Sequence, residues 1–103
     1  MKVIWLEQAD RALHLTADYI AVEYGQQSMI KFMCKIDEVG ILLKNNPYLG
    51  PEEPLLTGRT SVYRSVVVAK VNKIIYRIVN DTIEIADFWD VRREPQSLAG
   101  QVR

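Results

Sequence analysis

The sequence predicts an α+β domain in which a helical hairpin packs on one face of a mainly antiparallel, four-stranded sheet. Two long segments with apolar residues at helical spacing lie in the first half of the chain. Three short runs rich in β-branched and aromatic residues lie in the second half, and a short alternating run precedes the first helix. The predicted order is therefore strand, helix, helix, strand, strand, strand.

The composition is that of a single globular domain without a general attraction for nucleic acid. A chain of 103 residues has the size of one domain, so we expect one domain over residues 1–103. Thirteen basic and thirteen acidic side chains give a formal net charge of zero, so any basic site must be local. Because no apolar stretch is long enough to cross a membrane and no signal peptide is recognisable, we expect a cytoplasmic protein.

The inventory of residues excludes several kinds of site. One histidine, His14, and one cysteine, Cys34, cannot form a zinc-type ligand set, and no glycine-rich phosphate loop or nucleophile motif occurs. We therefore expect no metal and no cofactor. His14 is predicted at a helix surface or partly buried, and Cys34 is predicted to be a small buried hydrophobe.

The first half of the chain predicts a short strand followed by a helical hairpin. Residues 2–7 alternate as a strand does, and helical spacing then extends over about residues 8–24, where Gly25 is placed to end the helix. A second helix is predicted from residue 26 or 27 to residue 45. Gly40 in its interior is unfavourable for a helix, which suggests that another helix approaches closely there.

The second half predicts a long surface loop and an antiparallel meander. Residues 45–59 contain three prolines and two glycines, which are incompatible with regular structure over most of that stretch. The strand-like runs that follow cover residues 62–69, 73–79 and 82–89. A tight turn is predicted at Asn80-Asp81, and a three-residue turn at positions 70–72 with Asn72 in the left-handed conformation.

Charged and aromatic side chains on the meander are the candidates for a functional site. Arg64 and Arg77 lie within apolar strands, where a charge needs a partner or solvent, and on adjacent strands they could face each other. Each either pairs with a carboxylate, such as Glu84 or Asp87, or binds a phosphate or carboxylate ligand. Trp89 either stacks on a binding partner or fills the core.

The order of the elements and several short stretches resemble the RelE/ParE superfamily of toxins from type II toxin–antitoxin systems. The stretches are Asn46-Pro47-Tyr48-Leu49-Gly50, Tyr63-Arg64-Ser65, Lys73-Ile74-Ile75-Tyr76-Arg77, Ile83-Glu84-Ile85 and Trp89-Asp90-Val91-Arg92-Arg93-Glu94-Pro95. The resemblance covers almost the whole chain. It implies the RelE/ParE-like fold and a toxin that a cognate antitoxin neutralises.

The resemblance implies one of two activities. ParE-like members poison DNA gyrase, and the residues expected to contact such a target are Arg64, Arg77 and Trp89. RelE-like members cut messenger RNA on the ribosome, and the candidates for that chemistry are Arg64, Arg77, Asp90 and Arg92. Asp90 stands where many relatives have histidine, and no suitable general acid accompanies it, so the ParE-like activity is favoured. An inactive module that only binds an antitoxin is the third alternative.

The resemblance also implies how the antitoxin binds. An antitoxin segment that is disordered when free is expected to wrap the helical hairpin and to add against the edge of the sheet. Its acidic residues are expected to meet Arg59, Arg92 and Arg93. Large apolar side chains outside the helical stripes would supply further contacts, namely Tyr19, Ile30 and Ile41.

Overall fold

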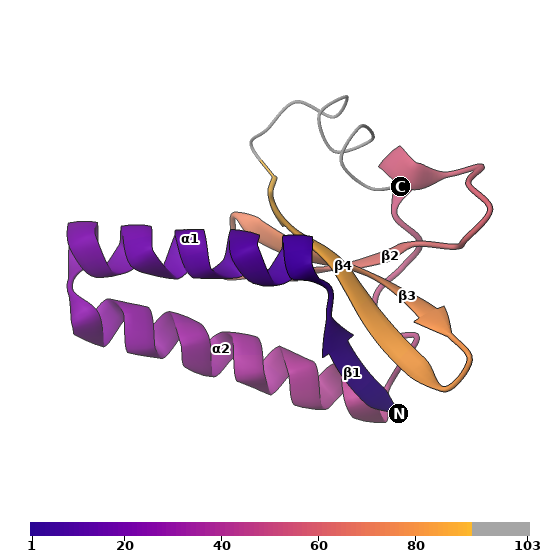
Figure 1. Ribbon diagram of the computed structural model, residues 1–103, viewed down its shortest axis with the longest axis horizontal. Coiled ribbons are helices and arrows are strands. Elements are labelled where there is room, and N and C mark those ends of the chain that lie inside the picture. The colour runs from indigo at the N-terminus through magenta and orange to yellow at the C-terminus, as the bar shows by residue number, and fades with distance from the viewer. Residues whose placement is uncertain (92–103) are drawn as a thin grey trace.

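The computed structural model describes residues 1–91 and confirms the predicted α+β arrangement (Figure 1). Its elements are β1 (Lys2–Trp5), α1 (Glu7–Tyr24), α2 (Gln26–Asn45), the short 3-10 helix η1 (Pro54–Leu56), β2 (Arg64–Val68), β3 (Asn72–Val79) and β4 (Thr82–Asp90). Among the described residues, no helix is long and apolar enough to span a membrane. Arg92 and Arg93 lie outside the described residues.

The sheet has the strand order β1-β4-β3-β2, so the first strand lies beside the last. β2, β3 and β4 form the predicted antiparallel meander, whereas β1 pairs in parallel with β4, from Lys2 beside Thr82 to Trp5 beside Ile85. β4 is longer than β1 and continues past it. The chain turns into α1 at this point, where the Leu6 N–H donates to the Ile85 carbonyl oxygen at 2.9 Å.

A single glycine connects the two helices. Gly25 has a φ of 93°, which disfavours other residues, and its N–H donates to the Ala21 carbonyl oxygen at the end of α1. Figure 1 shows the helices side by side, with this connection at the end of the hairpin that lies away from the sheet. The outer part of the hairpin therefore has no strand beneath it.

The main core lies between the helical hairpin and one face of the sheet, which we call the helix face. Its buried members are Ala9, Leu13, Ala17, Phe32, Ile36, Leu43, Val68, Ile74, Tyr76, Ile83, Ile85 and Phe88. Ala9 and Ala17 are the small buried side chains that α1 contributes to this core. The rings of Phe32 and Phe88 meet edge to face, with centroids 5.9 Å apart, which is a favoured aromatic geometry.

A β-bulge interrupts the alternation of β4. Ala86 is the extra residue in the pairing with β3, so that Ile85 and Phe88 both enter the main core although they are three positions apart. The Asp87 carboxylate is buried beside the bulge. It accepts hydrogen bonds from the Phe88 N–H at 2.8 Å and from Gln8 Nε2 at 3.1 Å, and so joins β4 to the start of α1.

Three local predictions are wrong. Asn72 is buried in β3 and is not left-handed; Ala69 and Lys70 have positive φ instead, because β2 ends earlier than predicted. Cys34 is exposed, because it lies on the side of α2 that faces away from the core. No helix approaches Gly40, since a Cβ atom added there would have no other atom within 4 Å.

Other local predictions are confirmed. Asn80 has a φ of 55° in a two-residue turn between β3 and β4. His14 is exposed on α1. Tyr19, Ile30 and Ile41 are exposed large hydrophobic residues, as their positions outside the apolar stripes predict.

Gly40 gives a direct test of this packing. Because the position is helical and has open space around it, Gly40→Ala should raise the free energy of unfolding by about 0.5–1 kcal/mol. Gly25→Ala is the matched control, with the same open space but a φ of 93°, and it should lower that free energy. Urea denaturation measures both, and a destabilised Gly40→Ala variant would contradict the packing described here.

Candidate functional site

The later part of the loop between α2 and β2 (residues 46–63), from Glu53 onward, covers the face of the sheet that lies away from the helices, which we call the outer face. A surface connection was predicted over residues 45–59, but Leu56 from that stretch is buried in a second core with Ile75, Trp89 and Tyr63, the last of which was predicted in a strand. Trp89 is only 1% exposed, so the prediction that it fills a core is confirmed. The predicted contact of Trp89 with a toxin target stays a prediction.

The beginning of this loop is attached to the sheet by the hydroxyl group of Tyr76. The hydroxyl donates to the Pro47 carbonyl oxygen at 2.8 Å and accepts from the Gly50 N–H at 3.0 Å. Gly50 lies so close to β2 that a Cβ atom there would be 2.3 Å from the Ser65 carbonyl oxygen, so only glycine fits. Burial raises the pKa of the Tyr76 phenol, although the Gly50 N–H and the Arg64 charge oppose this effect.

Arg64 lies next to this attachment on the helix face. It is directly opposite Tyr76 in the pairing of β2 with β3, and directly opposed residues point to the same face. Its Nη1 donates to the Gly50 carbonyl oxygen at 2.9 Å, and its guanidinium carbon lies 4.8 Å from the centre of the Tyr48 ring. Within residues 1–91, no carboxylate forms an ion pair with Arg64.

Arg77 points to the outer face and is paired. Its Nε donates to Glu84 Oε1 at 2.9 Å, its Nη1 donates to Ser61 Oγ at 3.1 Å, and its guanidinium carbon lies 5.9 Å from the Tyr63 ring centre. Glu84 is one of the two carboxylates that the sequence offered as a partner. The two arginines lie on opposite faces of the sheet, so the expectation that they could face each other is wrong, because Tyr76 and Arg77 alternate along β3.

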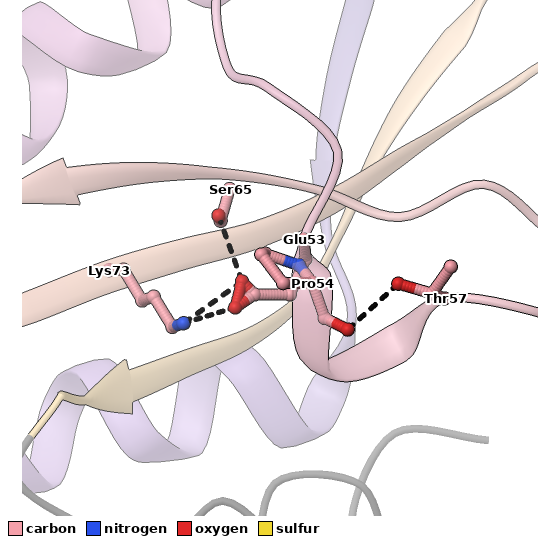
Figure 2. Close-up of polar contacts among 5 residues, drawn as sticks. All are labelled: Glu53, Pro54, Thr57, Ser65 and Lys73. Carbon is pink, nitrogen blue, oxygen red and sulfur yellow. Dashed lines mark hydrogen bonds and ion pairs between the residues drawn. The ribbon is translucent and has the colours of Figure 1, made fainter.

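A buried ion pair holds the middle of the loop to the outer face, and sequence reasoning missed it. Glu53 is 2% exposed, and both of its carboxylate oxygens accept hydrogen bonds from Lys73 Nζ (Figure 2). Ser65 Oγ donates to the same carboxylate at 3.1 Å. In the turn that follows Glu53, Thr57 Oγ1 donates to the Pro54 carbonyl oxygen at 2.8 Å. No signal in the sequence distinguishes Glu53 from its neighbour, since both acidic residues lie between prolines.

Three of the residues proposed for a nuclease, Arg64, Arg77 and Asp90, do not lie together in the structure. Asp90 is opposite Asn72 at one end of β3, whereas Arg64 is opposite Tyr76. Asn72 and Tyr76 are four residues apart on β3, which is about 13 Å along a strand. Arg77 is further away and on the other face, and Arg92 lies outside the described residues. Residues 1–91 contain no group of acidic, histidine or cysteine side chains that could hold a metal ion.

A hollow of about 760 Å³ lies between α1 and the end of the sheet where β4 passes β1. Exposed Leu15, Tyr19 and Tyr24 line it from the helix, and Asn72 and Phe88 line it from the sheet. The rings of the two tyrosines meet edge to face, with centroids 6.4 Å apart. Of the residues predicted to contact an antitoxin, Arg59 is half-buried in the loop, and the other two arginines lie outside the described residues.

The buried ion pair predicts strong coupling between its members. Lys73→Met leaves a buried carboxylate without its cation and should cost about 3–5 kcal/mol of unfolding free energy. The double variant Glu53→Gln with Lys73→Met should lose less than the sum of the single losses. Urea denaturation at pH 7 measures the cycle, with Arg11→Met in an exposed pair as the control that changes by less than about 1 kcal/mol. Strict additivity would contradict the coupling.

Tyr76 predicts a loss of stability in alkali. An unfolded tyrosine ionises near pH 10, whereas the raised pKa keeps Tyr76 protonated to higher pH in the folded state. Above about pH 10 the folded state therefore binds more protons, and the unfolding free energy falls as the pH rises. Tyr76→Phe should remove this alkaline component and cost about 1–3 kcal/mol at neutral pH, because it leaves the Gly50 N–H and the Pro47 oxygen without a partner. The exposed Tyr24→Phe is the control, and identical pH profiles for the two variants would contradict the prediction.

Comparisons with known proteins support the predicted fold. No family model and no curated protein matches the sequence. Among solved structures, a chain of the chromosomal ParDE TA (toxin–antitoxin) system from P. aeruginosa is similar, with a TM-score of 0.72 and 19% sequence identity. The similarity covers 89% of this chain and 97% of that chain. The RelE/ParE-like order β-α-α-β-β-β is thus confirmed, and the chain has the fold of a component of a toxin–antitoxin system.

Proposed function

We propose that this chain is a ParE-like toxin of a type II toxin–antitoxin system, that it inhibits DNA gyrase and that a cognate antitoxin neutralises it in the cytoplasm. The observation that carries the proposal is the fold shared with a chain of the ParDE system over 97% of that chain's length. The proposal is also supported by the RelE/ParE-like stretches in the described part of the chain, which are residues 46–50, 63–65, 73–77 and 83–85.

The charges of the sheet favour a toxin that is not a nuclease. Lys73 and Arg77 are each neutralised by a carboxylate of the same chain. Cleavage of RNA needs a base, an acid and cations gathered around one phosphate. Asp90 and Arg64 are instead separated along the sheet, and the formal net charge of the chain is zero. These features speak against docking onto ribosomal RNA.

A RelE-like, ribosome-dependent endoribonuclease is the alternative. The observation in its favour is Arg64, whose charge has no carboxylate partner within residues 1–91 and which stands where the superfamily's nucleases have a strand arginine. A phosphate of messenger RNA could occupy such a position.

The apolar surface of α1 supports the antitoxin as a partner. The hollow beside α1 combines aromatic and aliphatic side chains with polar ones, among them Arg11, Thr16 and Asp90, next to the part of β4 that β1 does not cover. An amphipathic or extended antitoxin segment would bury this surface. Arg59, Arg92 and Arg93 remain the predicted contacts for its acidic residues.

Growth and two biochemical assays test the proposal. Induction of the chain alone should arrest growth, and coexpression of the short reading frame beside its gene should restore growth and raise the soluble yield. Purified chain should inhibit supercoiling by gyrase and leave messenger RNA intact on programmed ribosomes. Cleavage of the ribosome-bound message without gyrase inhibition would establish the alternative, and absence of growth arrest would contradict both activities.

A further inference from the structure

We propose that Arg64 and Tyr48 form a docking site for an acidic side chain of a protein partner. Within β2, β3 and β4 the basic side chains are Arg64, Lys73 and Arg77. The two on β3 form ion pairs with Glu53 and Glu84, whereas Arg64 pairs with no carboxylate in the part of the chain that the structure describes. A half-buried guanidinium without a counter-ion is unfavourable unless a ligand supplies one.

The guanidinium has donors left for such a ligand. Its five N–H groups form a planar fork that matches the two oxygens of a carboxylate. One of its nitrogens donates to the Gly50 carbonyl oxygen at 2.9 Å, and the side chain lies over the Tyr48 ring. These contacts fix the plane of the guanidinium group. They leave N–H groups on its other edge that can donate to both oxygens of a carboxylate.

The site is held in place before any ligand binds. The Tyr76 hydroxyl bonds to both Pro47 and Gly50, the residues that flank Tyr48 and Leu49. The Leu49 N–H also donates to the Asn46 carbonyl oxygen at 2.9 Å, which closes the turn. Little conformational freedom is therefore lost when a partner docks, which favours affinity.

The surroundings predict the chemistry of the partner. Tyr48 is 68% exposed and Leu49 is 44% exposed, so an apolar surface adjoins the cation. A partner that matches this surface presents an aspartate or glutamate next to an aliphatic side chain. Nucleic acid fits poorly, because binding to phosphates needs several cations along the backbone and the two neighbouring strand cations are already neutralised.

If the chain is the toxin proposed above, its antitoxin supplies this acidic residue. The site itself is defined by contacts within this chain, so that it can be tested without the antitoxin.

A titration followed by NMR provides that test. The side-chain Nε–Hε resonance of Arg64 should shift saturably with the peptide acetyl-Leu-Glu-Leu-amide and should not respond to acetyl-Leu-Gln-Leu-amide. The matched control is Arg77, whose Nε is bonded to Glu84 and whose resonance should stay unchanged. Equal responses to both peptides, equal shifts at both arginines, or tighter binding of hexauridylate than of the acidic peptide would overturn the proposal.

Binding to the coexpressed antitoxin separates this inference from the proposed function. Arg64→Gln should weaken that binding at least about tenfold, the loss expected for a charged hydrogen bond. The exposed Tyr48→Ala keeps the Arg64–Gly50 bond and should also weaken binding, whereas Asp81→Ala, in the exposed turn between β3 and β4, should leave binding unchanged. Unchanged antitoxin affinity in both site variants would refute the docking site and leave the toxin proposal standing. Absence of growth arrest would refute the toxin proposal and leave the peptide result valid.

Discussion

The Tyr76 hydroxyl connects β3 to the loop that follows α2, two parts of the molecule that are far apart in the sequence. The phenol ring belongs to the main core, and the hydroxyl group bonds to two backbone groups of the loop that follows α2. One buried group thereby satisfies both a donor and an acceptor that would otherwise lose their bonds to water. The position of Gly50, and through it the orientation of the Arg64 side chain, depends on this contact.

The sheet has two covered faces that are built differently. The helix face is packed by apolar side chains from two helices, whereas the outer face combines a small apolar cluster with two ion pairs beneath a loop. The charges of Lys73 and Arg77 serve the attachment of that loop and contribute little attraction for a ligand. Of the basic side chains on β2, β3 and β4, Arg64 at the edge of the sheet is therefore the one whose charge is not paired with a carboxylate of residues 1–91.

Sequence reasoning predicted the elements well and the side-chain partners poorly. The helices were found because their apolar residues recur at helical spacing and Gly25 marks the end of the first helix, and Asn80 marked the tight hairpin. The face to which Arg64 and Arg77 point depends on strand register, which is set by packing over the whole sheet. Glu53 and Lys73 are separated by 20 positions, and no local pattern indicates their pairing.

The bulge at Ala86 gives β4 a position at which a single residue can be lost during evolution without exchanging the faces of the strand. Strands usually tolerate the gain or loss of residue pairs, because the alternation of faces is then kept. Removal of Ala86 would leave Ile85 and Phe88 two positions apart, the spacing that regular alternation gives to side chains on one face, so that Phe88 and Trp89 would each stay in their own core. Loss of one residue at the bulge therefore keeps the faces of β4, whereas loss of one residue elsewhere in the strand would exchange the faces of every later side chain.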